Sequence, residues 1–206
     1  MFNDILVLAP HTDDGEIGCG GSIAKFIDMG SNVHYVSFTL AEESVPNTFP
    51  KDILLKEVSL AVASLGITQL TTHNFPVRNF SNHRQEILDI MIKLNNNLKP
   101  DLVFMPSTHD IHQDHKTISE EGLRAFKHTS ILGYEMIWNN INFSNQCFIS
   151  IQKEHLQKKI DSLKYYESQK KRYYFTEEFI KSLAITRGTQ IDKHYAEVFE
   201  VIRWVM

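Results

Sequence analysis

Two groups of histidines and carboxylates stand out in the sequence, and each directly follows an apolar run. The first lies in Pro10–Glu16, of sequence PHTDDGE, after Ile5–Ala9. The second lies in His109–His115, of sequence HDIHQDH, after Leu102–Pro106. Short apolar runs of this kind are typical of buried parallel strands. Carboxylates and imidazoles at the ends of such strands need a cation or proton chemistry, because burying them unpaired is costly. The pattern predicts a divalent metal site in an enzyme.

The residue types favour a metal held by nitrogen and oxygen atoms. A catalytic zinc commonly takes three protein ligands from His and Asp or Glu, and leaves a fourth position for water. His11 and Asp14 could supply two ligands, and one histidine of His112-x-x-His115 could supply the third. Such a set fits zinc, with Fe(II), Co(II) or Mn(II) as alternatives. Asp13 would then stay free beside the metal as a general base.

The histidine that does not bind the metal could polarise a substrate carbonyl or hold its oxyanion, with Asp114 orienting the ring. The alternative interpretation is a set of satisfied polar residues without a metal. In that case Asp13 or Asp14 would cap the following helix, and His112 and His115 would lie on the surface. Two clusters that each follow a strand favour the metal site.

Length and composition predict one globular domain spanning residues 1–206, because 206 residues can bury a substantial core. The net charge of −4 gives no attraction to nucleic acid or anionic membranes. Cys19 and Cys147 match no metal or redox pattern, so we expect two buried thiols. The sequence has no basic region before its first apolar run and no stretch of about 18 apolar residues. We therefore expect a cytoplasmic protein without a membrane span.

The chain alternates between strand and helix signals in its first half. Strands are expected at Ile5–Ala9, within Asn32–Leu40, at Gln69–Asn74 and at Leu102–Met105. Helices are expected at Ile17–Met29, Ile53–Leu65, Gln85–Leu98 and Lys116–Phe126. The second half adds strands at Tyr134–Trp138, Phe148–Ile151 and Tyr195–Arg203, and a helix at Lys153–Tyr166. This alternation predicts an α/β fold with three α/β/α layers and a Rossmann-like, mostly parallel sheet.

Ligands of such sheets bind outside the carboxyl ends of the strands. With the common strand order 3-2-1-4, the loops after Ala9 and Met105 would share one crevice. The glycines of Gly18–Gly21 do not follow the G-x-G-x-x-G spacing of nucleotide-binding loops, so we expect them to let a helix pack closely on the sheet. The basic run Lys170–Arg172 is expected to be a solvated helix end.

At these residues the chain resembles the LmbE-like, or PIG-L-type, zinc-dependent deacetylases. Their first motif, Pro-His-x-Asp-Asp-x-Glu followed by Gly-Cys-Gly-Gly, stands here at residues 10–16 and 18–21. Their second motif, His-x-Asp-His, stands at residues 112–115. Further family features are Asp110 and the segments 167–169, 187–188 and 195–197, so the resemblance spans nearly the whole chain.

The resemblance implies a metal-dependent hydrolase that removes an N-acetyl group from an amino sugar or sugar conjugate and releases acetate. It implies that zinc is held by three residues: His11, Asp14 and His115. Asp13 would be the general base, and a protonated His112, paired with Asp114, would stabilise the oxyanion. The partner would be a small N-acetylated sugar, and some relatives assemble as trimers or hexamers.

One position departs from the family pattern. The family often has an arginine three residues before a glutamate in its second helix, where it binds substrate. Here Leu54 stands three residues before Glu57, with Lys56 nearby. The departure concerns substrate specificity more than chemistry, because the metal motif is intact.

Two other functions remain as alternatives. A metal-dependent phosphoesterase of the two-metal type would need more carboxylate ligands than the sequence offers. A non-catalytic module that binds sugars or nucleotides would keep the scaffold without a tightly held metal.

Overall fold

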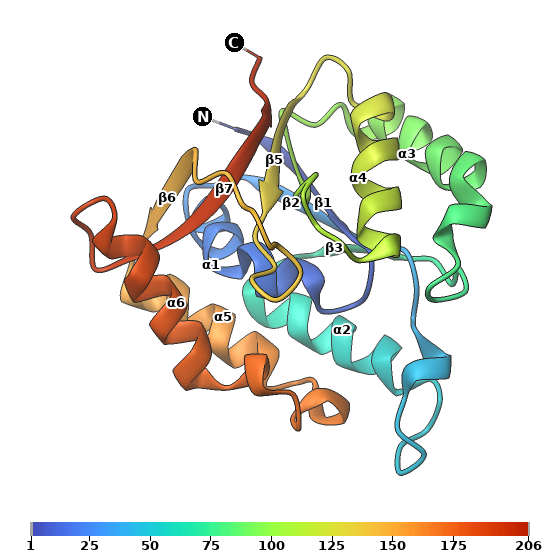
Figure 1. Cartoon of the computed structure of the whole chain (residues 1–206), viewed down its shortest axis with the longest axis horizontal. Coiled ribbons are helices and arrows are strands. Elements are labelled where there is room, and N and C mark those ends of the chain that lie inside the picture. Colours follow the sequence, from blue (N-terminus) through green and yellow to red (C-terminus); the bar gives the residue numbers. More distant parts are fainter. Residues whose placement is uncertain (1, 206) are drawn as a thin grey trace.

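The centre of the computed structural model, which describes residues 2–205, is a seven-stranded sheet of order β3-β2-β1-β4-β5-β7-β6 (Figure 1). Strands β1 to β5 pair in parallel, whereas β7 pairs antiparallel with both β5 and β6. The strands are β1 (Asp4–Ala9), β2 (Asn32–Ser37), β3 (Gln69–Thr72), β4 (Leu102–Pro106), β5 (Ser130–Tyr134), β6 (Cys147–Ile151) and β7 (Tyr195–Arg203). The expected 3-2-1-4 order is confirmed.

Helices cover both faces of the sheet and complete the three expected layers (Figure 1). One face carries α1 (Asp14–Asp28), α2 (Ile53–Leu65), α5 (Lys153–Leu163) and α6 (Glu177–Thr189). The other face carries α3 (Arg84–Leu98) and α4 (Gln113–Ala125). Four short 3-10 helices lie in the connections: η1 (Glu42–Ser44), η2 (Phe80–His83), η3 (Glu167–Gln169) and η4 (Tyr173–Phe175). None of the helices described between residues 2 and 205 combines the length and apolarity of a membrane span.

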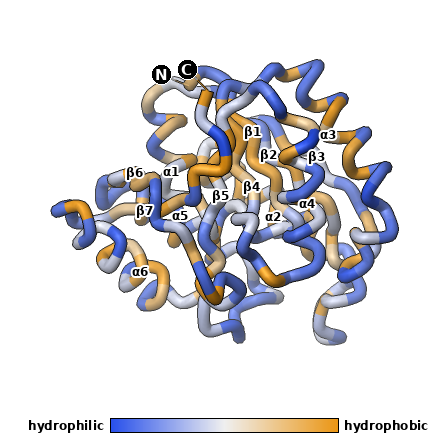
Figure 2. The backbone as a smooth tube through the Cα atoms, turned by 45° about the horizontal axis from the view of Figure 1, so that its top comes forward, coloured by the Kyte–Doolittle hydropathy of each residue, from blue (hydrophilic) through white to orange (hydrophobic). Residues whose placement is uncertain are grey.

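The two faces of the sheet belong to two separate apolar cores. In β1, Ile5 and Val7 pack into the core under α1 and α2, whereas Leu6 and Leu8 pack into the core under α3 and α4. This split follows from the two-residue period of a strand, which sends successive side chains to opposite faces. Apolar residues accordingly follow the central strands, and polar residues dominate the outer helices and loops (Figure 2). The sheet is therefore held rigidly from both sides.

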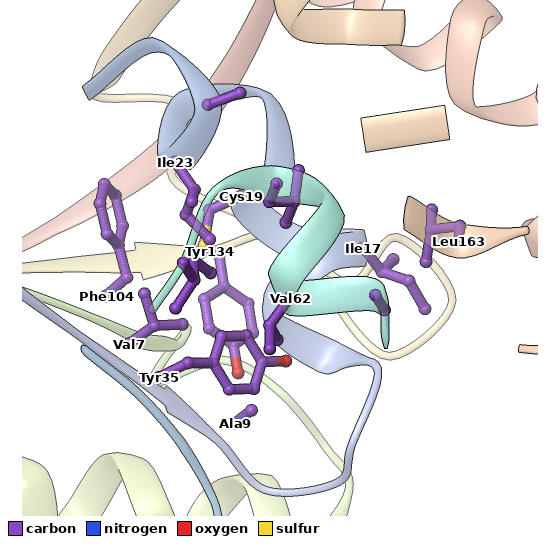
Figure 3. Packing of buried hydrophobic residues seen from close by; sticks show 14 of the residues in the cluster. Val7, Ala9, Ile17, Cys19, Ile23, Tyr35, Val62, Phe104, Tyr134 and Leu163 are labelled. Carbon is purple, nitrogen blue, oxygen red and sulfur yellow. The ribbon is translucent and has the colours of Figure 1, made fainter. Parts of the chain in front are cut away.

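Helix α1 approaches the sheet closely because of its glycines, as expected from the sequence. A Cβ atom on Gly15 would lie 2.5 Å from the Tyr35 ring, and one on Gly18 would lie 2.5 Å from the Tyr134 ring. Both rings belong to the core beneath α1 and α2, next to Val7 (Figure 3). The Tyr134 hydroxyl donates to the Leu8 carbonyl oxygen at 3.0 Å. The glycines thus bring the start of α1 against the end of β1.

In the second half of the chain one expected strand is misplaced and one helix was not expected. The strand expected at Tyr134–Trp138 lies earlier, at Ser130–Tyr134, where Gly133 weakens the strand signal. Helix α6 was not expected, although Thr176 followed by two glutamates is a typical helix start, and the Thr176 side chain does cap the helix.

Two smaller expectations also need correction. Cys19 is fully buried, but Cys147 is only half-buried; both are free thiols. The run Lys170–Arg172 is exposed, but it follows the 3-10 helix η3 rather than ending an α-helix.

Replacing Gly18 with Ala tests the close packing of α1. Overpacking costs about 1–3 kcal/mol, and the better helix propensity of alanine offsets up to about 1 kcal/mol, so we expect the free energy of unfolding to fall by about 1–2 kcal/mol. Gly20→Ala is the matched control, because its Cβ would meet the flexible Lys159 stem at 3.0 Å and should cost less. Urea unfolding of both variants measures the difference. Equal stability of Gly18→Ala and the wild type would contradict this packing.

Candidate metal centre

The loops after β1 and β4 meet at one edge of the sheet, because the two strands are parallel neighbours. His11 follows β1, whereas His112 and His115 lie at the start of α4. The ring centroid of His11 lies 4.9 Å from that of His112 and 5.2 Å from that of His115. The crevice expected from the strand order therefore exists, and it brings together residues about a hundred positions apart.

Three side-chain atoms form a nearly equilateral triangle at this point. His11 Nδ1 lies 3.0 Å from Asp14 Oδ2, His115 Nε2 lies 3.2 Å from Asp14 Oδ2, and the two nitrogens lie 3.2 Å apart. Ligand atoms about 2.0–2.1 Å from a tetrahedral zinc would lie roughly 3.3 Å from one another. The donor atoms of His11, Asp14 and His115 therefore have the types and spacing that suit one small divalent cation.

His112 adds a fourth candidate donor to this triangle. One ring nitrogen from each of His11, His112 and His115 lies within 4.8 Å of the other two. That group is looser than the triangle that includes Asp14.

Each histidine of the triangle has a carboxylate on its other ring nitrogen. His115 Nδ1 lies 2.7 Å from Asp110 Oδ2, and His11 Nε2 lies 3.2 Å from Asp114 Oδ2. Both Asp110 and Asp114 are buried. Carboxylates in this position orient metal-binding histidines and raise their basicity. The arrangement thus aims His11 Nδ1 and His115 Nε2 at the same point.

The contacts of Asp114 differ from those expected. Its carboxylate accepts the backbone N–H of Arg78 at 2.7 Å and contacts His11, whereas no hydrogen bond joins it to the His112 ring among the residues described. Instead, the backbone N–H of Asp114 donates to His112 Nδ1 at 3.2 Å, so that His112 caps α4. Helix α4 consequently begins at Gln113, before the expected Lys116. Asp114 therefore positions His11 and the chain at Arg78.

Asp13 lies beside the triangle, and its side chain has no hydrogen-bond partner on another residue in the part of the chain that the structure describes. Its side chain makes no capping bond to α1, contrary to the metal-free interpretation, and it lines a cavity of about 240 Å³. The cavity is also lined by His11, Asp14, His112 and His115, so its floor is the histidine–carboxylate cluster.

Glu16 ends the first motif and supports the loop from below. It is fully buried and contacts the hydroxyls of Tyr35 and Tyr166, the latter at 2.8 Å. The same hydroxyls lie 3.0 and 2.7 Å from the Thr12 carbonyl oxygen, between His11 and Asp13. Burial raises the pKa of Glu16 to about 8, so its carboxyl group is largely protonated at neutral pH. This network fixes the backbone that carries His11 and Asp13.

The sequence matches a known family over more than half of its length. Residues 6–126 match the family described as PIG-L: GlcNAc-PI de-N-acetylase. The chain belongs to the PIG-L family. The matched range contains both clusters that form the triangle, so the resemblance seen in the two motifs is confirmed.

Individual relatives agree with this assignment. The chain is 29% identical over 175 residues to the Escherichia coli K12 protein called uncharacterized deacetylase YaiS. This alignment covers 80% of the chain and 90% of the relative. The fold matches N,N'-diacetylchitobiose deacetylase from Pyrococcus horikoshii, solved with an inhibitor, with a TM-score of 0.81 at 22% identity, covering 98% of this chain and 84% of the other. It also matches GalB, the 4-carboxy-2-hydroxymuconate hydratase of Pseudomonas putida KT2440, with a TM-score of 0.81 at 17% identity, covering 99% and 98% of the two chains. The α/β fold is thereby confirmed.

Electrostatics make the triangle of this PIG-L domain attractive to cations. Burial disfavours the charged forms of His11 and His115, but Asp14, together with Asp114 beside His11 and Asp110 beside His115, outweighs it and raises their pKa values to about 9 and about 10. Burial likewise opposes the charge of Asp14, but His115 and His11 hold its pKa well below its usual range. Protons occupy the site in the absence of a metal, and a metal would have to displace them.

Asp13 and His112 lie beside the triangle, and their pKa values shift in the directions opposite to those of the aspartate and the histidines within it. Burial, and then the nearby Asp14 carboxylate, raises the pKa of Asp13 to about 6. Burial, and then the charges of His115 and His11, lowers the pKa of His112 to about 4. In the metal-free site His112 is therefore neutral at pH 7; the protonated role that the family resemblance implies for catalysis stays a prediction. Because its Nδ1 accepts a hydrogen bond, its proton lies on Nε2.

The upper wall of the cavity comes from residues that sequence reasoning missed as part of the site. Glu57 of α2 accepts hydrogen bonds from the Ser168 backbone N–H at 2.9 Å and the Ser168 hydroxyl at 2.6 Å, which fixes η3 beside the cavity. The wall itself is formed by Arg78, Trp138, Gln169, Arg172 and Tyr174. The basic run at 170–172 and the family segment 167–169 were the two signals that could have indicated this wall. Leu54 also lines the cavity, so the position of the family arginine is apolar here.

The state of His112 can be measured directly. In chelator-treated protein we expect its ring to titrate with a midpoint near pH 4, because burial and its histidine neighbours disfavour the charged form. The ring is then charged below that pH and neutral above it, with the proton on Nε2. Nitrogen-15 NMR of the imidazole groups reports both the midpoint and the tautomer. A midpoint near 6.5, or a proton on Nδ1, would contradict the geometry.

Proposed function

We propose that this PIG-L family member is a metal-dependent amidohydrolase that removes the N-acetyl group of an amino sugar or sugar conjugate and releases acetate. The observation that carries the proposal is the donor triangle with the unpartnered Asp13 carboxylate beside it in one cavity. A relative of the same fold is named for deacetylating N,N'-diacetylchitobiose, which supports an N-acetylated sugar as the substrate class.

The residues proposed to hold the metal are His11, Asp14 and His115, with zinc the favoured ion and other divalent transition metals as alternatives. A bound divalent metal would supply Lewis-acid chemistry at the floor of the cavity. Asp110 and Asp114 would keep the two imidazoles oriented through their other ring nitrogens.

Asp13 is proposed as the general base. As a water molecule attacks the amide carbonyl carbon, the Asp13 carboxylate accepts one of its protons. The C–N bond then breaks, the amine leaves with that proton, and the acyl group leaves as acetate. A pKa of about 6 keeps Asp13 ionised at neutral pH and makes it a stronger proton acceptor than an ordinary aspartate.

His112 is proposed to stabilise the oxyanion as a neutral donor. Because Nδ1 accepts the capping hydrogen bond of α4, the proton lies on Nε2, and this N–H has no hydrogen-bond partner within residues 2–205. A hydrogen bond from this group to the former carbonyl oxygen would strengthen as negative charge develops there. The cap holds the ring in place before the substrate arrives, so little reorganisation is needed.

The same fold carries a different reaction in the Pseudomonas putida hydratase, so the fold alone does not decide the chemistry. Hydrolysis of an acetamide produces acetate and a free amine in equal amounts, whereas hydration of a double bond produces neither. Measuring both products over a panel of N-acetylated sugars therefore tests the proposed reaction.

Removing one donor of the triangle should remove the metal. We expect close to one divalent ion per wild-type chain, and a large loss of it in His115→Ala. His128→Ala is the control, because His128 is exposed and away from the cavity. Metal content by mass spectrometry of the purified proteins gives the comparison. Full metal occupancy in His115→Ala would show that the ligand assignment is wrong.

Adjacent residues give the sharpest test of the catalytic roles. Asp13→Asn keeps the shape of the side chain but cannot accept a proton, so kcat should fall by about 10²- to 10⁴-fold while the metal stays bound. Asp14→Asn should instead lose metal, and added metal should partly restore its activity. Acetate release and metal content are measured for both variants. The opposite pattern, with metal lost only from Asp13→Asn, would reverse the two assignments.

A further inference from the structure

Two guanidinium groups line the cavity, and within residues 2–205 neither lies at ion-pair distance from a carboxylate. Arg78 lies between β3 and η2, and Arg172 lies between η3 and η4. By contrast, the exposed Lys170 pairs with Glu167. Arginines that lack an ion-pair partner and converge on one cavity are suited to binding an anion that enters it.

The charge of the cavity points the same way. Metal binding requires neutral histidines, so in the metal-bound form the charged lining consists of the carboxylates Asp13 and Asp14 and the guanidinium groups of Arg78 and Arg172. The two carboxylates and two guanidinium groups cancel. If Asp14 binds a divalent ion as proposed, the loaded cavity carries an excess of positive charge. A substrate with a negative charge would neutralise that excess, whereas a neutral sugar would not.

Arg172 is held in position rather than moving freely on the surface. Its Nη1 donates to the Tyr174 hydroxyl, and its guanidinium carbon lies 5.8 Å from the centre of the Tyr174 ring. The Tyr174 ring in turn stacks on Trp138, with the ring centres 3.9 Å apart and the planes 19° from parallel. The aromatic pair thus lowers the entropy lost when Arg172 binds a ligand.

The backbone of Arg78 is linked by a hydrogen bond to the histidine–carboxylate cluster. Its N–H donates to Asp114 Oδ2 at 2.7 Å, and the same oxygen contacts His11. Its φ of 65° lies in the left-handed region, which non-glycine residues adopt rarely and usually under constraint from their surroundings. The Asp114 contact supplies such a constraint and fixes where the Arg78 side chain begins.

We infer that the substrate is an N-acetylated amino sugar with an anionic substituent, a carboxylate or a phosphate, which Arg78 and Arg172 bind while the acetamide lies over the histidine–carboxylate cluster. The inference rests on the proposed deacetylase function and narrows its substrate class. Arg78 and Arg172 would be specificity-determining residues. A guanidinium group binds two oxygens of a planar carboxylate or of a tetrahedral phosphate through paired N–H donors.

The test compares three sugars that differ in charge: N-acetylglucosamine, N-acetylglucosamine 6-phosphate and N-acetylmuramic acid, which carries a carboxylate. With metal-loaded wild-type protein, we expect kcat/KM for at least one anionic sugar to exceed that for the neutral sugar by about 10- to 100-fold, the scale of a hydrogen bond to a charged group. The anionic sugar that is preferred identifies the substituent as a phosphate or a carboxylate.

The variants Arg172→Gln and Arg78→Gln should lower the ratio of anionic to neutral kcat/KM by about tenfold or more. The ratio is the readout because Arg172 also acts on Asp13 through its charge, which would change the rate for every substrate alike. Lys171→Gln is the matched control: it removes the same charge one residue away, from an exposed side chain outside the cavity lining, and should leave the ratio within about twofold.

Calorimetric binding of the deacetylated products separates this inference from the proposed function. Glucosamine 6-phosphate or muramic acid should bind at least about tenfold more tightly than glucosamine, and Arg172→Gln should remove the difference. Equal binding of all three products, no binding of any, or an unchanged preference in both arginine variants overturns the inference. Failure to release acetate from any sugar, with the anionic preference in binding intact, overturns the proposed reaction and leaves the anion site standing.

Discussion

A single carboxylate oxygen, Asp14 Oδ2, organises the centre of this protein. It contacts the ring nitrogens of His11 and His115 at 3.0 and 3.2 Å, and it also accepts the His11 backbone N–H at 2.7 Å. The contact with His115 is available only because β1 and β4 are neighbours and end at the same edge of the sheet. The order of the strands is therefore a chemical requirement as much as a packing result.

Much of the structure serves to hold the backbone around this oxygen. Glycines at the start of α1 let the rings of Tyr35 and Tyr134 pack directly against this helix. The hydroxyls of Tyr35 and Tyr166 then support the Thr12 carbonyl, and Glu16 fills the space between them. A buried polar network of this kind is costly when it is incompletely satisfied and rigid when it is complete. Rigidity is what a site with fixed donor positions needs.

The sequence was enough to predict the sheet, its strand order near the site and the convergence of the two clusters, because these depend on short apolar runs and on polar residues at their ends. It was insufficient where the relevant contacts are specific to the folded chain. The pairing of Asp114 with His11 rather than His112 depends on the helix cap made by His112 Nδ1, which no spacing reveals. The cavity wall from Trp138 to Tyr174 was missed because aromatic and basic residues in irregular segments carry no periodic signal.

The two halves of the site come from different parts of the chain. The donor triangle and Arg78 lie within residues 6–126, the range shared with the PIG-L family, whereas the other four wall residues, Trp138, Gln169, Arg172 and Tyr174, lie beyond it. Substitutions in the later segments can therefore reshape the mouth of the cavity while the histidine–carboxylate floor stays untouched. Descendants of such a protein could change the molecules they act on without passing through an inactive form. The separation of the donor residues from most of the wall residues along the sequence would thus allow substrate specificity to evolve independently of the histidine–carboxylate floor.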